Sequence, residues 1–128
     1  MNRYITVGVA MLAGAGLGAA AIQTLHAQAK PPAYYVVEIT VKDQDGYMKE
    51  FVPSAEKSRQ DAGGKFIARG GKTLALQGAA PAPRVVVIQF DNLDKLQAWW
   101  NSSAQKSAQA IGDKYGTFRS YAVEGASQ

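Results

Sequence analysis

Apolar residues in this chain follow two periods, one typical of strands and one typical of helices, and the two alternate along the sequence. Four short runs rich in aromatic and β-branched residues predict strands: residues 34–41, 65–69, 84–90 and 117–124. After the second run, Gly70 and Gly71 are expected to form a bulge or a sharp bend. The extended pattern then resumes over residues 73–77.

A first helix is expected between the first two strands. Its apolar positions recur at helical spacing: Tyr47, Met48, Phe51, Val52 and Ala55. Asp45 is a candidate N-cap. Pro53 lacks a backbone donor and is expected to kink the helix, which should end at Gly63 and Gly64.

A second helix is expected after the strand at residues 84–90. Asp91 or Asn92 can cap it, and its apolar face is supplied by Leu93, Leu96, Trp99 and Trp100. Residues 101–103 form a weak break. Helical spacing continues beyond that break and is expected to end at Gly116.

The predicted order is strand, helix, strand, strand, helix, strand. This βαββαβ order is the split βαβ pattern of the ferredoxin-like sandwich, an α+β fold. Right-handed crossovers place both helices on one face of a four-stranded antiparallel sheet. The other face of the sheet is left uncovered.

The uncovered face is expected to be partly apolar. On the strands at residues 34–41 and 84–90 it would carry Tyr34, Val36, Glu38, Thr40, Val85, Val87 and Gln89. A surface this apolar is unfavourable in water. Pairing two sheets about a two-fold axis would cover it, so we expect a homodimer in the form of a dimeric α/β barrel.

Residues 1–29 have the organisation of a secretory signal peptide. Arg3 supplies the positive start, a Gly- and Ala-rich apolar stretch follows, and Ala27-Gln28-Ala29 fits a signal peptidase site. The alternative is an uncleaved membrane anchor, although Gly and Ala are weakly apolar for a spanning helix. We expect cleavage near Ala29, a periplasmic or secreted protein, and no stable membrane anchor afterwards.

The expected mature chain comprises three segments, a linker at residues 30–33, one domain at residues 34–125 and a tail at residues 126–128. The whole chain carries 14 Lys and Arg against 10 Asp and Glu, a formal net charge of +4. These positive residues are scattered without a run of three. That distribution indicates a solvated surface and no nucleic-acid partner.

The mature chain would hold no histidine and no cysteine, because His26 is the single histidine and the sequence has no cysteine. A histidine-ligated haem and a Ser-His-Asp or Cys-His nucleophile are thereby excluded. Carboxylates remain as the available metal ligands, and they are not clustered at ligand spacing, so a metal site is not supported. We expect no metal and no cofactor. General acid–base chemistry would fall to Glu38, Asp61, Tyr47 or a lysine.

Arg69, Gly70 and Gly71 are a candidate anion site, in which backbone amides at a glycine-rich bend lie beside a guanidinium. The alternative is a β-bulge with a surface arginine. Arg84 would lie near Arg69 if their strands form a hairpin, and the two could hold a carboxylate. They could equally form structural ion pairs with Glu38 or Glu124.

Aromatic residues near the helix ends are further candidates for a ligand pocket. Trp99 and Trp100 point about 100° apart on a helix. One is expected in the core, and the other in a helix–sheet pocket or a dimer interface. Tyr47 and Tyr115 could flank the same pocket, and Ser102 is a candidate polar group beside the tryptophans.

The chain resembles the family called domain of unknown function 1330. The resemblance rests on FIARGG at residues 66–71, Gly78, RVVVIQF at residues 84–90, AWWNS at residues 98–102 and VEG at residues 123–125. It covers residues 34–125 and implies the dimeric α/β-barrel fold, without an established biochemical function.

The chain departs from the family pattern at three places. Family members usually carry Glu at the position of Gln89, Tyr at the position of Trp100, and Ser-Pro-Glu-Tyr at residues 102–105. If that Glu and Tyr form a polar site in other members, part of the site is missing here. The predicted signal peptide is a further difference.

Two functions remain open at this point. The first is a non-catalytic exported homodimer that binds a small ligand or another protein. The second is a cofactor-independent enzyme acting on a small organic molecule, by analogy with monooxygenases and isomerases of the barrel superfamily. A buried cavity with a strongly shifted carboxylate would favour the enzyme, and a filled helix–sheet core would exclude it.

Overall fold

The computed structural model describes residues 30–127, so the predicted signal peptide at residues 1–29 lies outside the described residues. The elements follow in the order β1 (Ala33–Val41), α2 (Gln44–Gly46), η1 (Tyr47–Phe51), α3 (Val52–Asp61), β2 (Lys65–Arg69), β3 (Arg84–Phe90), α4 (Leu93–Trp100), α5 (Ser103–Tyr115) and β4 (Gly116–Glu124). This is the predicted α+β ferredoxin-like βαββαβ fold. β1 begins at Ala33, one residue earlier than expected.

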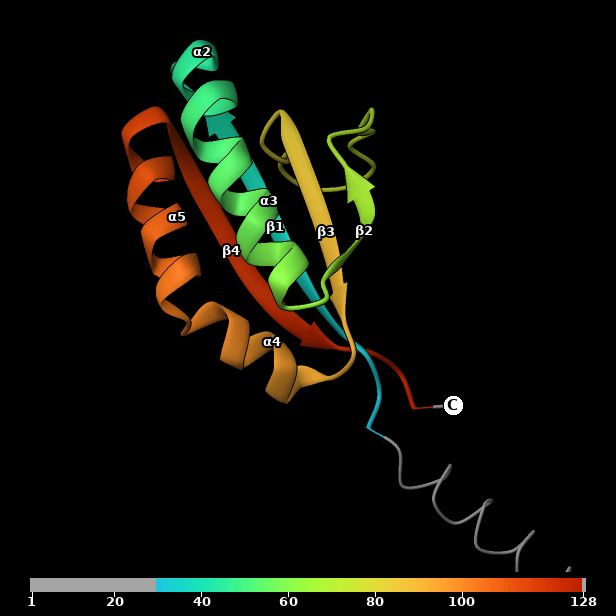
Figure 1. The fold of residues 1–128 in the computed structure, drawn as a ribbon. Coiled ribbons are helices and arrows are strands. Elements are labelled where there is room, and N and C mark those ends of the chain that lie inside the picture. The colour runs from blue at the N-terminus through green and yellow to red at the C-terminus, as the bar shows by residue number, and fades with distance from the viewer. Residues whose placement is uncertain (1–29, 128) are drawn as a thin grey trace, which may run out of the picture. The chain divides into compact units, whose positions relative to one another are not determined.

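The four strands form one antiparallel sheet in the order β2-β3-β1-β4. The helices lie together on one face of this sheet (Figure 1). β1 and β3 alternate between buried and partly exposed residues, as the sequence pattern predicts. The core therefore lies between the helices and the alternate residues of the two central strands.

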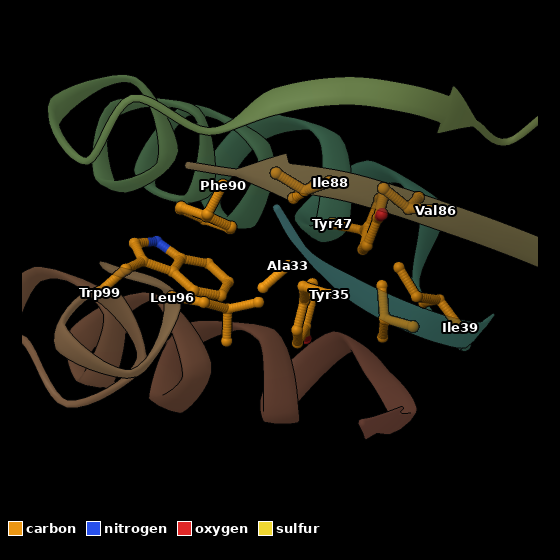
Figure 2. Close-up of a cluster of buried hydrophobic side chains, with 10 residues drawn as sticks. Ala33, Tyr35, Ile39, Tyr47, Val86, Ile88, Phe90, Leu96 and Trp99 are labelled. Atoms are coloured by element: carbon orange, nitrogen blue, oxygen red, sulfur yellow. The ribbon is translucent and has the colours of Figure 1, made fainter. Parts of the chain in front are cut away.

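Side chains from β1, β3, η1 and α4 build this core (Figure 2). Its largest fully buried side chain is Phe90. The Trp99 ring lies 4.9 Å, centroid to centroid, from both Tyr35 and Phe90. Aromatic contacts of this geometry add to the free energy gained by burying apolar surface.

The first helical segment differs from expectation at its start. Asp43, rather than Asp45, is the N-cap, and its carboxylate accepts from the Gly46 backbone N–H at 3.2 Å. Pro53, which was expected to kink the helix, lies in the first turn of α3, and the residues directly before it keep the right-handed helical conformation. The irregularity takes the form of the π-helical turn η1 immediately before it.

The region after β2 also differs from expectation. A bulge lies at Ile67, between Phe66 and Ala68, whereas Gly70 forms the sharp bend that was the other expected alternative. Residues 73–77 form no strand and are exposed, with Leu74 and Leu76 among them. The reason is geometric: Gly70 leaves the strand with φ of +64°, and the following residues have no strand beside them to bond.

The second helical region breaks where the sequence predicts. Asn92 caps α4 by accepting from the Lys95 N–H at 2.9 Å. The chain then turns at Asn101, and α5 begins after Ser102. α5 ends at Gly116, where β4 starts.

Candidate functional site

The helix–sheet core is not completely filled. A cavity of about 80 Å³ lies between α3, η1 and the strands β1, β2 and β3. Its aromatic lining consists of Tyr35, Tyr47, Phe51, Phe66 and Trp99. Three arginines, Arg59, Arg69 and Arg84, and the carboxylate of Glu56 also line it. Of the two features that would favour an enzyme, a cavity and a carboxylate with a strongly shifted pKa, the cavity is present.

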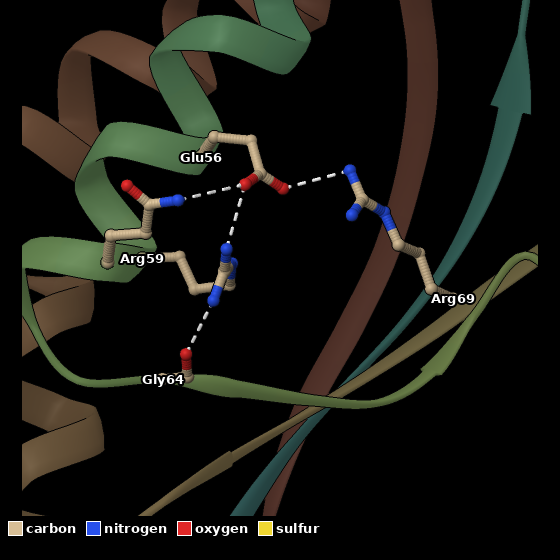
Figure 3. Close-up of polar contacts among 5 residues, drawn as sticks. Glu56, Arg59, Gly64 and Arg69 are labelled. Atoms are coloured by element: carbon tan, nitrogen blue, oxygen red, sulfur yellow. Dashed lines mark hydrogen bonds and ion pairs between the residues drawn. The ribbon is translucent and has the colours of Figure 1, made fainter.

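Both oxygens of Glu56 are held by arginines (Figure 3). Arg59 Nη2 lies 2.8 Å from Oε2, and Arg69 Nη2 lies 2.9 Å from Oε1. Arg59 also donates through Nη1 to the Gly64 carbonyl at 2.6 Å. The guanidinium carbons of Arg59 and Arg69 lie 4.2 Å and 4.3 Å from the centroid of the Phe66 ring. These contacts fix α3 against β2 at one wall of the cavity.

Arg84 differs from the other two arginines. Within residues 30–127 its side chain has no ion-pair partner. Its buried Nε has no acceptor, which is also true of Arg59 Nε, but Arg59 pairs with Glu56. Its nearest aromatic contact is Tyr47, whose ring centroid lies 5.9 Å from the guanidinium carbon. A partly buried cation without a counter-ion is costly, so Arg84 is the group in this cavity that most needs a partner.

Gly70 is the reason that Arg84 can take this position. A Cβ atom on Gly70 would lie 2.5 Å from Arg84 Nη1, and the φ of Gly70 is +64°. The Gly70 N–H donates to the Val85 carbonyl at 2.9 Å, which fixes the bend beside β3. Gly71 is exposed, and a Cβ atom there would meet no other atom within 4 Å.

The structure therefore divides the predicted Arg69-Gly70-Gly71 site. Arg69 pairs with Glu56, Gly70 supports Arg84, and Gly71 faces open space. The alternative prediction of a structural ion pair is confirmed for Arg69, but its partner is Glu56. Within residues 30–127 neither Arg69 nor Arg84 pairs with Glu38 or Glu124, and Glu38 pairs with Arg119 at 2.7 Å. The prediction that Arg69 and Arg84 lie near each other is confirmed, since both line the cavity.

Trp99 is the tryptophan of the core, and only 4% of its surface is exposed. Its indole Nε1 donates to Ser58 Oγ at 3.0 Å, and Ser58 donates to Gln105 Oε1 at 3.0 Å. This chain of hydrogen bonds joins α3, α4 and α5 behind the cavity. Trp100 is partly buried and lines other hollows with Tyr35, on the β4 side of the sheet.

Ser102 has a structural role. Its hydroxyl donates to the Trp99 carbonyl at 2.7 Å and accepts from the Gln105 N–H at 3.2 Å, which caps α5. Neither Ser102 nor Tyr115 lines the arginine cavity. Tyr115 instead packs closely against the backbone of Gly46.

A second hollow of about 240 Å³ lies between β1, α5 and β4. Tyr35 contributes to it as well as to the arginine cavity. Burial raises the pKa of the Tyr35 phenol above 10.0, against a lowering by its hydrogen bond with Ser120. Gln109 lines the hollow, and its buried Nε2 has no acceptor.

Sequence reasoning missed Glu56, Arg59 and Ser58. Glu56 and Arg59 are three residues apart on α3, a spacing that permits pairing but is common on helices. Gln89, where the family usually has Glu, lies opposite Tyr34 on the open face of the sheet. It therefore does not share a cavity with Trp100, which packs on the helix side.

In the described part of the chain, residues 30–127, no three His, Cys, Asp or Glu side chains gather closely enough to hold a metal ion. Across the same residues, no helix is both long enough and apolar enough to cross a membrane.

Several solved structures share this fold. A protein of unknown function from Rhodopseudomonas palustris is 11% identical, with a TM-score of 0.61 over 83% of this chain and 92% of that chain. SnoaB, a cofactor-independent oxygenase from Streptomyces nogalater, is 12% identical, with a TM-score of 0.55 over 77% of this chain and 96% of that chain.

A dimeric protein of unknown function with a ferredoxin-like fold, from Bacteroides fragilis, is 13% identical, with a TM-score of 0.50 over 76% of this chain and 99% of that chain. At these identities the likeness shows the fold alone. A search of curated protein sequences found no match to this chain. Residues 32–126 match the sequence model of the domain of unknown function DUF1330, and the chain therefore belongs to that family.

Proposed function

We propose that this protein is an exported homodimer that binds a small organic molecule in the arginine cavity without transforming it. The observation that carries the proposal is the cavity itself, which is lined mainly by aromatic and aliphatic side chains and holds the guanidinium of Arg84, for which no ion pair is present within residues 30–127. Pockets of this composition, apolar with a few convergent polar groups, are typical small-molecule sites.

A binding role fits the cavity better than catalysis does. Glu56 is the carboxylate among the described residues that line the cavity, and both of its oxygens are engaged by arginines. A proton acceptor held in this way is poorly placed to take a proton from a ligand. Tyr35 and Tyr47 are the remaining titratable groups of the lining that could exchange one.

The alternative is a cofactor-independent enzyme in the same cavity. The similarity in fold to a cofactor-independent oxygenase favours it, but a shared fold does not carry an activity. The enzyme would have to act through Tyr35 or Tyr47. Conversion of the bound molecule by the purified protein, lost in a Tyr47→Phe variant, would favour this alternative.

The homodimer would form through the open face of the sheet. The register places Val36 between Val87 and Tyr121, and Tyr34 between Gln89 and Val123, as adjacent rows on that face. Tyr121 and Val123 are 51% and 49% exposed. A second copy packed on these rows would bury them, and the similar Bacteroides fragilis protein is described as dimeric.

Native mass spectrometry of the full chain, expressed in bacteria and recovered from the periplasm, tests the proposal. We expect a dimer whose subunits begin near Lys30 and which carries additional mass that is lost on denaturation. A matched pair of variants locates the molecule. Ala55→Leu fills the cavity and should lose the additional mass, whereas Ala110→Leu, on an exposed position of α5, should keep it.

Three results would contradict separate parts of the proposal. A monomer would exclude pairing through the open face. A chain retained in the cytoplasm with residues 1–29 intact would exclude export. Additional mass that survives Ala55→Leu would place the molecule outside the arginine cavity.

A further inference from the structure

Resting on the proposed function, we infer the class of molecule that the cavity takes: a small monocarboxylate with a flat apolar body. Its carboxylate would be bound by Arg84, and its body would lie against the aromatic lining beside Tyr47 and Trp99.

The balance of charge in the cavity favours an anion. The charged groups of its lining are three arginines and one glutamate, which leaves an excess of two positive charges. Glu56 cannot supply the missing charge to Arg84, because Arg59 and Arg69 already occupy its two oxygens. A bound anion would offset this excess of positive charge and would supply the counter-ion that Arg84 lacks.

The geometry of Arg84 indicates which of its nitrogens would donate to the carboxylate of the ligand. Its Nε is buried, has no acceptor within residues 30–127 and belongs to a side chain that lines the cavity. The Nε edge of a guanidinium can donate two parallel hydrogen bonds to a carboxylate. Gly70 leaves room for Nη1, because a Cβ atom at residue 70 would lie 2.5 Å from it.

The size and lining of the cavity favour an apolar body on that carboxylate. A cavity of about 80 Å³ has several times the space that a single water needs, so it admits more than an isolated water. Apart from the arginines, Glu56 and Gln105, the lining residues are apolar or aromatic, including Ile39, Val86 and Ile88. A bare inorganic anion would leave these walls without contacts, whereas a benzoate-sized molecule would cover them.

Binding measurements on the mature dimer, residues 30–128, test this inference with benzoate, its neutral isostere benzamide, and inorganic phosphate. Trp99 lines the cavity, so tryptophan fluorescence reports occupancy, and calorimetry gives the affinity. We expect benzoate to bind about tenfold or more tightly than benzamide, as expected for a charge-assisted hydrogen bond. Phosphate should bind more weakly than benzoate.

Two substitutions of Arg84 and one control variant distinguish the effect of the Arg84 charge on affinity from a general effect of charge or folding. Arg84→Gln should weaken benzoate binding about tenfold or more and leave benzamide binding unchanged. Arg84→Lys should retain part of the preference for benzoate, because it keeps the charge and loses the two-pronged geometry. Lys114→Gln removes an equal charge from the exposed end of α5 and should change neither affinity.

Equal affinity for benzoate and benzamide, unchanged by Arg84→Gln, would overturn the carboxylate assignment while leaving small-molecule binding intact. Phosphate binding as tight as benzoate binding would overturn the inference that the ligand has an apolar body. If none of the probes binds and native spectra show a dimer without additional mass, the inference and the proposed function both fail.

Discussion

Gly70 and Arg84 are in direct contact, so close that a Cβ atom at residue 70 would lie 2.5 Å from Arg84 Nη1. Gly70 directly follows β2 and Arg84 begins β3, and the register that pairs Arg69 with Val86 brings them together. The N–H of Gly70 donates to the Val85 carbonyl, so this amide is already engaged within the protein. Because Gly70 has no side chain, it leaves room for the guanidinium of Arg84, which lines the cavity.

Gly70→Ala should displace Arg84 and weaken ligand binding. It should also cost about 1 kcal/mol of unfolding free energy, because alanine is strained at a positive φ. Gly78→Ala is the matched control, since Gly78 has φ of +76° and no atom within 4 Å of its Cβ position. Urea unfolding should show similar losses for both variants, with weaker benzoate binding in Gly70→Ala alone. Equal binding by the two would show that Gly70 does not position Arg84.

Arg84 and Arg59 should respond oppositely to replacement by methionine. Arg59→Met breaks an ion pair with Glu56 and a hydrogen bond to the Gly64 carbonyl, and should cost about 1–3 kcal/mol. Arg84→Met removes a cation without a partner and should leave the ligand-free protein equally stable or more stable. Denaturant unfolding of the ligand-free variants measures both. If Arg84→Met lowers the free energy of unfolding as much as Arg59→Met does, the charge of Arg84 is already stabilised in the ligand-free protein.

The fold could be predicted because its signals are local. Alternation along residues 34–41 and 84–90 specifies which side chains are buried, and helical spacing over residues 93–100 specifies the face of α4. The strand expected at residues 73–77 was wrong because a strand also needs a bonding neighbour, which local pattern does not report. The helix start was misplaced because Asp43 and Asp45 are both able to cap.

The candidate site could be predicted only in part, because its contacts join distant segments. The sequence singled out Arg69, Arg84, Tyr47 and Trp99, all of which line the cavity. Glu56 was missed, since its importance depends on α3 packing beside β2 and bringing Arg69 within 2.9 Å. Ser102 was selected as a neighbour of the tryptophans, but its hydroxyl is used by the helix end.

Ser102→Ala should reduce stability without affecting the cavity. The substitution removes the N-cap of α5 and should cost about 1 kcal/mol. Ser103→Ala, at the adjacent exposed position, should change the unfolding free energy by less than about 0.5 kcal/mol. Thermal or urea unfolding compares the two. Weaker benzoate binding by Ser102→Ala would show that Ser102 also contributes to ligand binding.

Glu38 should make stability depend on pH in the acid range. Its Oε1 accepts from the Ala82 N–H at 2.9 Å, and that bond, together with the Arg119 ion pair, lowers the pKa of Glu38 below 4.5. Since the unfolded chain then binds this proton more readily, stability should fall as the pH drops through the unfolded and then the folded pKa. Urea unfolding between about pH 6 and pH 3 should show a shallower fall in Glu38→Gln.

The control for Glu38 is Glu50→Gln, which removes an exposed carboxylate on η1 and should keep the slope of the unaltered protein. If Glu38→Gln also keeps that slope, the contacts with Ala82 and Arg119 do not contribute to acid stability. In that case the anchoring of residues 70–83 to the sheet through Ala82 would not depend on the ionised carboxylate.

Tyr121→Glu should separate the proposed dimer into folded monomers. Tyr121 lies beside Val36 on the open face, so two-fold pairing would bring two introduced carboxylates into one apolar interface. Burying unpaired charges there costs several kcal/mol, enough to dissociate the dimer at about micromolar concentration. Met48→Glu is the matched control, because Met48 is 49% exposed and lies on η1, away from that face. Light scattering coupled to gel filtration should give a monomer for Tyr121→Glu and a dimer for Met48→Glu. The reverse result would place the interface on the helices, and the uncovered apolar rows would then need a different partner.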